Sequence, residues 1–115
     1  MIEIPDALSA LGVPVERQPY TGSANQYVLF NLTHHGHSDW ASGKAIQDEW
    51  IYAVHLFSRG NFKALAKLLL KLLREAGWTV TEGPELYEED TQYHHLVFDA
   101  RCWEDIEEEP EESNG

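Results

Sequence analysis

The sequence predicts an α+β fold, in which an antiparallel β-β-α-β-β sheet carries one long amphipathic helix on one face and follows a short N-terminal helix. Two observations lead to this prediction. Apolar residues recur at three- and four-residue steps through 61–77, which is the pattern of a helix with one buried face. Segments on both sides of that helix alternate apolar and polar residues, as half-buried strands do.

The N-terminal third predicts short elements. Residues 6–11 fit a helix that Gly12 stops, with Pro5 acceptable at its start. Residues 13–17 fit a brief edge strand, because Pro14 is poorly tolerated in a central one. After a turn at 19–23, residues 27–33 are rich in β-branched and aromatic side chains and predict a strand.

The middle of the chain predicts a loop and a central strand. Residues 34–45 are polar and contain two glycines, so we interpret them as a flexible hairpin connection. Residues 48–58 form the clearest strand pattern, with an apolar row on one face and Ile51, Ala53, His55 and Phe57 on the other, so both faces look largely covered. The apolar row consists of Trp50, Tyr52, Val54 and Leu56.

The helix over 61–77 has recognisable ends, because Asn61 fits an N-cap and Gly77 stands where a left-handed C′ residue is needed. Its solvent face carries four basic residues: Lys63, Lys67, Lys71 and Arg74. A strand at 78–81, a turn at Gly83 and Pro84, an acidic segment at 85–90 and a final strand at 93–103 complete the predicted fold.

Length and charge indicate one domain with an acidic tail. The 115 residues predict a single domain over 1–103, and residues 104–115 predict a disordered C-terminal tail. Seven of the twenty carboxylates lie between Glu104 and Glu112, so the net charge of −12 falls to −5 for the rest. This balance gives no basic surface for phosphate binding. The lone Cys102 excludes an intrachain disulfide, and no signal peptide or membrane span is expected.

Candidate catalytic and metal-binding residues all have simpler explanations. His34, His35, His37 and Asp39 resemble metal ligands, but they fall in the predicted loop, so we expect no metal site. His94 and His95 should point to opposite faces of a strand. The carboxylate neighbours at 48–49 and 88–90 fit charged turns and strand ends, and Cys102 fits a small core position. We therefore expect no catalytic residues, no cofactor and no enzymatic activity.

Three phrases of the chain resemble small tail-completion or tail-terminator proteins of long-tailed bacteriophages and their prophages. They are Q-P-Y-T-G at 18–22 leading into Y-V-L-F, V-H-L-F-S-R-G-N-F at 54–62, and E-A-G-W-T-V at 75–80 continued by G-P-E-L-Y-E-E-D-T at 83–91 and Y-H at 93–94. The resemblance covers about residues 13–103. The histidine-rich segment and the acidic tail depart from the family.

The resemblance implies a virion structural role at the head–tail junction, in a protein made in the host cytoplasm. Such proteins form rings, often hexameric, that cap the head-proximal end of the tail tube, stop its polymerisation and meet the head connector. DNA would only pass through the lumen. A ring needs two different patches on each subunit. We expect the basic helix face to be one patch and the acidic hairpin to be the other, with the latter formed by Glu85, Tyr87, Glu88, Glu89 and Asp90.

Three alternatives remain open. A head–tail connector or head-closure protein would have similar properties. A small acidic inhibitor that mimics DNA would carry carboxylates across its folded body, whereas here they concentrate in the tail. A metal-dependent hydrolase would require the 34–39 loop to order around a metal ion.

Overall fold

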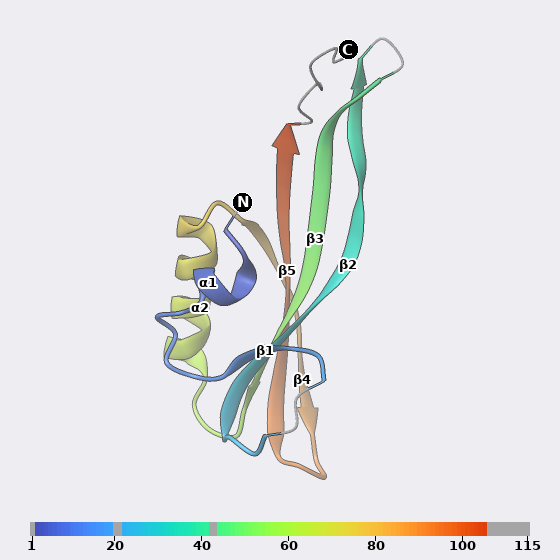
Figure 1. The fold of residues 1–115 in the computed structure, drawn as a ribbon. Coiled ribbons are helices and arrows are strands. Elements are labelled where there is room, and N and C mark those ends of the chain that lie inside the picture. The colour runs from blue at the N-terminus through green and yellow to red at the C-terminus, as the bar shows by residue number, and fades with distance from the viewer. Residues whose placement is uncertain (1, 20–21, 42–43, 106–115) are drawn as a thin grey trace.

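The computed structural model in Figure 1 describes residues 2–19, 22–41 and 44–105, of which 38–41, 44–46 and 105 are described as backbone only. Five strands form one sheet in the order β1-β2-β3-β5-β4. The elements are α1 (Ile4–Ala7), β1 (Val15–Arg17), β2 (Gln26–Ala41), β3 (Lys44–Ser58), α2 (Lys63–Glu75), β4 (Thr79–Glu88) and β5 (Tyr93–Asp105).

The predicted fold class is wrong. Most of the described residues lie in strands, and the sheet is mixed because β1 pairs with β2 in parallel. Both helices are short: α1 has 4 residues and α2 has 13. They cover only the lower part of one side of the sheet, while β2, β3 and β5 continue far beyond them (Figure 1). We call the covered side the helix side and the other the open side.

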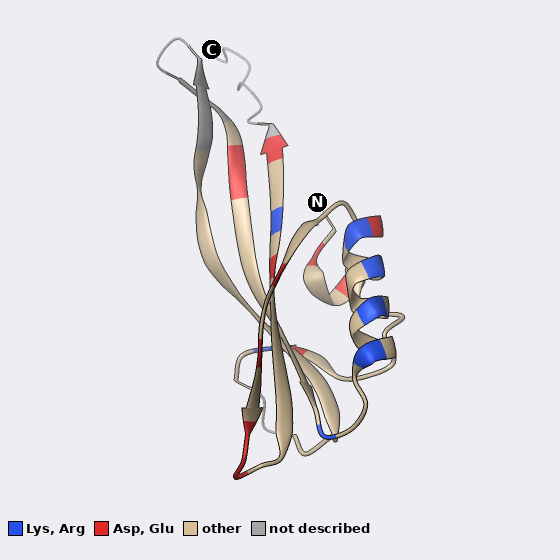
Figure 2. Ribbon diagram, turned by 180° about the vertical axis from the view of Figure 1, so that it is seen from behind, with Lys and Arg blue, Asp and Glu red and all other residues tan. Residues whose placement is uncertain are grey.

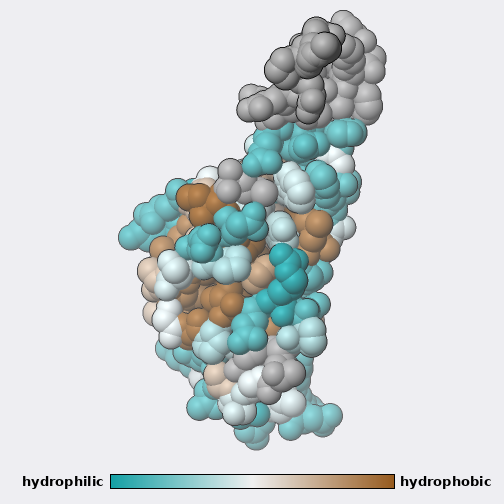
Figure 3. Space-filling view, viewed as in Figure 1, coloured by the Kyte–Doolittle hydropathy of each residue, from teal (hydrophilic) through white to brown (hydrophobic). Residues whose placement is uncertain are grey.

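The part of the sheet beyond the helices is an arm, defined here as residues 34–41 of β2, 44–51 of β3 and 101–105 of β5. Strands β2 and β3 stay paired from Gln26 opposite Ser58 to Ala41 opposite Lys44. The predicted hairpin connection at 34–45 is therefore wrong, since 34–41 and 44–45 are strand. The surface of the arm is mainly hydrophilic below the undescribed residues, whereas hydrophobic residues gather over the body (Figure 3). A strand without a core beneath it lacks the apolar alternation that reveals strands in a sequence.

A β-bulge at Thr33 separates the arm from the body. Leu32 lies opposite Tyr52 and His34 lies opposite Ile51, so Thr33 is an extra residue in β2. Its hydroxyl donates a hydrogen bond to the Ile51 carbonyl at 3.0 Å. Side chains alternate between faces along a strand, so the extra residue reverses which residues of β2 face the helix side.

The hydrophobic core lies between the helices and the lower sheet. Leu69 and Leu73 of α2 are fully buried there, against strand residues that include the predicted row Tyr52, Val54 and Leu56. The remaining buried members of this core are Ile4, Leu8, Leu11, Val28, Phe30, Trp78, Phe98 and Ala100. A smaller cluster of Leu29, Phe57 and Tyr93, with Tyr27 against it, lies apart from this core.

The sequence predicts the C-terminal end of α2 correctly and its N-terminal end less well. Gly77 has φ +100°, and the Trp78 amide reaches the Leu73 carbonyl at 3.0 Å, as a left-handed helix end requires. The N-cap position belongs to Phe62 and not to the predicted Asn61, because α2 begins at Lys63, although Asn61 Oδ1 still accepts a hydrogen bond from the Lys63 amide at 3.0 Å.

Two other predicted boundaries are wrong. The first helix spans Ile4–Ala7 and not 6–11. Gly83 and Pro84 interrupt the pairing of β4 with β5 between Glu82 and Glu85 without forming a turn. A side chain at Gly83 would lie 2.9 Å from the Val97 carbonyl, so a glycine permits the close approach of the two strands.

Candidate functional site

The basic face of α2 is a regular row of cations. Lys63, Lys67, Lys71 and Arg74 are all exposed and follow one another along the outer side of the helix (Figure 2). The burial of Leu69 and Leu73 on the sheet directs these residues outward. Lys71 lies 4.0 Å from Glu75 on the next turn, an exposed pair of low energy. Among the described residues, no carboxylate forms an ion pair with the other three.

The acidic hairpin is the connection of β4 to β5. Its predicted residues Glu85, Tyr87, Glu88, Glu89 and Asp90 are all exposed. The turn has a defined geometry, because the Gln92 amide reaches the Glu88 carbonyl at 2.7 Å and Gln92 adopts φ +63°. The Thr91 hydroxyl donates to Glu88 Oε1 at 3.0 Å. The negative charge therefore sits on an ordered element.

The structure does not bring the basic row and the acidic hairpin together within one chain. Figure 2 shows the basic row on the outer side of α2 and the acidic tip at the end of the β4–β5 hairpin, pointing away from it. Each patch also carries an exposed apolar side chain. Tyr87 is 53% exposed in the hairpin, and Leu68 is 36% exposed between Lys67 and Lys71.

His94 and His95 point to opposite faces, as predicted. His94 lies on the helix side, 3.1 Å from Glu85 and with its ring 5.3 Å from that of Phe62. His95 lies on the open side, where its Nε2 is 2.8 Å from Nδ1 of His55. Burial lowers the pKa of His95, with Glu88 acting in the opposite direction.

His55 and His95 belong to a polar network that the sequence did not reveal. His55 Nε2 lies 3.2 Å from Asn31 Oδ1, and His95 Nδ1 lies 3.9 Å from Glu88. Burial lowers the pKa of His55, and the neighbouring His95 lowers it further, against Asp99. The register of β3 with β5 creates the contact across 40 residues of sequence. The only sequence signal was one histidine in the non-core row of each strand.

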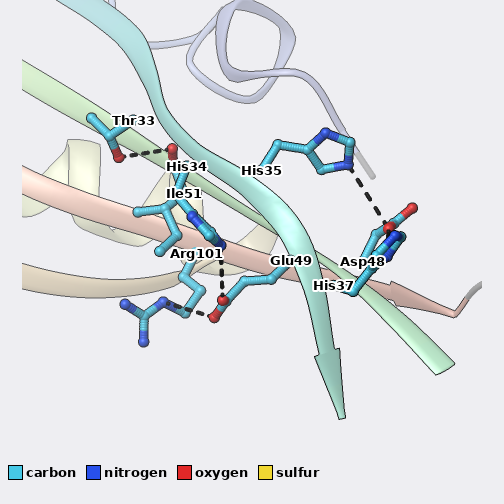
Figure 4. Close-up of polar contacts among 8 residues, drawn as sticks. All are labelled: Thr33, His34, His35, His37, Asp48, Glu49, Ile51 and Arg101. Carbon is cyan, nitrogen blue, oxygen red and sulfur yellow. Dashed lines mark hydrogen bonds and ion pairs between the residues drawn. The ribbon is translucent and has the colours of Figure 1, made fainter. Parts of the chain in front are cut away.

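The histidines at 34–37 lie on both sides of the arm (Figure 4). On the open side, His34 is 3.5 Å from Glu49, which also pairs with Arg101 at 3.4 Å. On the helix side, Asp48 Oδ1 lies 3.1 Å from His37 and 3.9 Å from His35. The His35 ring also stacks on Trp50, with a centroid separation of 3.6 Å.

The described residues contain no group of three or more histidine, cysteine, aspartate or glutamate side chains that could hold a metal ion. Cys102 is half-buried beside Trp50 in the sheet, and burial raises the pKa of its thiol, which disfavours the reactive thiolate. β5 includes Glu104 and Asp105 of the predicted tail, and residues 106–115 of that tail lie outside the described residues.

No protein-family model matches the chain, and no curated protein matches it either. Within the described ranges, neither helix has the length and apolar character needed to cross a bilayer.

Proposed function

We propose that this chain is a virion structural protein of a long-tailed bacteriophage or prophage, a tail terminator or tail-completion protein without enzymatic activity. In this role, copies form a ring, with six as the expected number, at the head-proximal end of the tail tube. The ring ends tube polymerisation and joins the tail to the head connector, and DNA passes through its lumen without specific binding. The observation that most supports this proposal is the pair of oppositely charged patches on separate parts of the same chain.

Two separated complementary patches suit repeated head-to-tail contacts. A contact between unlike patches leaves one patch of each kind free, so copies keep adding until the rotation closes a ring. The basic row on α2 would receive the acidic hairpin of the next copy. The sequence resemblance to tail-completion proteins agrees with a ring of this kind.

Charge alone would not hold such a ring together. Exposed ion pairs contribute about 0.2–1 kcal/mol each and weaken as salt rises. Buried aromatic side chains contribute most to interfaces, often about 2 kcal/mol or more. In the proposed contact, Tyr87 of one copy packs on Leu68 of the next, and the surrounding charges set orientation and association rate.

A charge-swap experiment tests the contact. Variant one carries Lys67→Glu and Lys71→Glu, and variant two carries Glu89→Lys and Asp90→Lys. Each variant places like charges in every contact, so neither should form a ring alone. Their equimolar mixture should form an alternating ring, because each helix then faces a hairpin of opposite charge. Light scattering and native mass spectrometry measure the assembly.

Glu3→Lys with Glu16→Lys is the matched control, since both residues are exposed carboxylates outside the two patches. The control should assemble like the unaltered chain and shorten tubes when added to polymerising tail-tube protein. Rings formed equally well by each single variant would show that the patches are solvated surface. A chain that forms no ring and neither binds tube ends nor limits tube length would refute the proposed function. Binding to the head connector with no effect on tube length would favour the connector alternative.

A further inference from the structure

The turn of the acidic hairpin, residues 88–92, is held from outside by one side chain. Arg59 follows β3 directly, and its Nε donates a hydrogen bond to the Thr91 carbonyl at 3.0 Å. The other hydrogen bonds and ion pairs of this turn in the described chain stay within β4, β5 and the turn itself. Arg59 is therefore the one described residue that ties the turn to another part of the fold by a hydrogen bond.

The guanidinium of Arg59 lies on a fixed aromatic ring. Its Cζ is 4.3 Å from the centre of the Tyr93 ring, which is a cation–π distance. Tyr93 is 7% exposed, meets the Phe57 ring edge-on, and donates its hydroxyl hydrogen to the Ala24 carbonyl at 2.8 Å. The Arg59 amide donates to the Asn25 carbonyl at 3.0 Å. The backbone and the guanidinium of Arg59 are thus both fixed by the fold.

The turn that Arg59 holds contains a residue in the left-handed region. Gln92 adopts φ +63°, a conformation that residues other than glycine disfavour. Such a conformation persists only where surrounding contacts determine it. Here the Gln92 amide donates to the Glu88 carbonyl at 2.7 Å, and Arg59 holds the carbonyl of the preceding residue. Loss of the Arg59 contact should therefore let the turn open more often.

Arg59 holds the turn without pairing with its carboxylates. Its hydrogen bond goes to a backbone carbonyl, and among the side chains that the structure describes, no carboxylate forms an ion pair with it. Glu89 and Asp90 are exposed at the tip of the hairpin. Their carboxylates therefore stay available to a neighbouring copy while the backbone that carries them is fixed.

We propose that Arg59 is a positioning residue for the ring contact, because it fixes the acidic hairpin in the shape that the basic row of the next copy receives. This inference rests on the proposed function. Arg59 acts through Thr91 and Tyr93, and the carboxylates of the hairpin make the contact. A hairpin ordered in advance loses less conformational freedom on binding, so the ring forms at a lower protein concentration.

Two substitutions at residue 59 separate the hydrogen bond from the charge. Arg59→Ala removes the hydrogen bond, the ring contact with Tyr93 and the charge. Arg59→Gln places an amide nitrogen as many bonds from the backbone as Nε, so it can keep the bond to the Thr91 carbonyl without the charge. Arg17→Ala is the matched control. Arg17 is also exposed, with its Cζ 4.9 Å from the centre of the Phe30 ring, but it lies in β1 at the opposite edge of the sheet.

Hydrogen exchange of the Gln92 amide measures how firmly the turn is held, at a concentration where the chain is a monomer. Exchange should be about thirtyfold faster or more in Arg59→Ala, because a charged hydrogen bond and a cation–π contact are both lost. Arg59→Gln should accelerate it about fivefold or less. Arg17→Ala should leave it unchanged. Equal exchange rates in Arg59→Ala and the unaltered chain would overturn the proposal.

Ring assembly gives the second measurement. The dissociation constant of the ring contact should rise about tenfold in Arg59→Ala, because affinity falls with the fraction of hairpins that keep the turn. Arg59→Gln should recover most of this loss. Val28→Ala lowers overall stability from the core and should leave the ring contact unchanged. Equal weakening of the ring by Val28→Ala would make the role of Arg59 merely structural and overturn the proposal.

Failure of the positioning role and failure of the proposed function can be distinguished. A ring that forms equally well with Arg59→Ala refutes the positioning role and leaves the proposed function intact. Faster exchange at Gln92 in Arg59→Ala, in a chain that never forms a ring, confirms that Arg59 holds the hairpin and refutes the proposed function. Recovery of the ring by Arg59→Lys but not by Arg59→Gln would show that only the charge matters, and would refute the positioning role.

Discussion

Lowering the pH from 8 to 5.5 should destabilise the fold through His55 and His95. Their nitrogens lie 2.8 Å apart, and a hydrogen bond at that distance needs one unprotonated nitrogen. The folded pair can therefore hold at most one excess proton. Burial lowers the pKa of both histidines, which agrees with this limit.

The sign and size of the effect follow from proton counting. Two histidines in the unfolded chain each bind a proton below about pH 6.5, and the folded pair excludes at least one of them. The unfolded state therefore binds more protons, so stability is complete above this pH and falls below it. For one excluded proton, the loss is about 1.4 kcal/mol at pH 5.5 and grows by about 1.4 kcal/mol per further pH unit.

Urea denaturation between pH 5 and 8 measures this loss. His95→Gln removes one titrating group and leaves an amide near His55. The unfolding free energy of this variant should therefore not show the loss of about 1.4 kcal/mol at pH 5.5 that the histidine pair causes. His37→Gln is the matched control, because His37 is an exposed histidine outside the pair. The His37→Gln variant should keep the loss of unfolding free energy that the His55–His95 pair causes below pH 6.5. If His95→Gln and the unaltered chain lose stability in parallel below pH 6.5, the proton-exclusion reasoning is wrong.

Two further substitutions test the fold. Leu69→Ala should cost about 2–5 kcal/mol in urea denaturation, because Leu69 is fully buried, whereas Leu68→Ala on the exposed side should stay within about 1 kcal/mol. Equal losses would contradict the placement of α2. Gly77→Ala should cost about 1–2 kcal/mol because φ is +100° and nothing lies near the added methyl group, so the cost is purely conformational. Gly60→Ala, where φ is not positive and space is also open, should be nearly neutral, and a similar loss at both glycines would exclude that cause.

Elements with a hydrophobic face were predictable from the sequence. Leu69 and Leu73 recur at helix spacing because one side of α2 packs on the sheet, and Tyr52, Val54 and Leu56 alternate because β3 crosses the core. Gly77 was also predictable, since a left-handed helix end is a local requirement.

Features that depend on pairing between strands were not predictable. Residues 34–41 of the arm carry no apolar period, and their polarity suggested a loop, whereas the structure places them in β2. The parallel β1 rests on three residue pairs with β2. The contact between His55 and His95 exists only because β3 and β5 pair in one register. The basic row and the acidic hairpin were identified by residue type, but only the fold shows that they lie apart.

The bulge at Thr33 divides β2 into two segments whose sequences can change under different constraints. Below it, Val28 and Phe30 are fixed by the volume of the core, and a change there is felt by the whole fold. Beyond it, none of the residues from His34 to His37 belongs to the buried core, so the volume of the core does not limit their side chains. A substitution at these positions should therefore disturb core packing less than one at Val28 or Phe30.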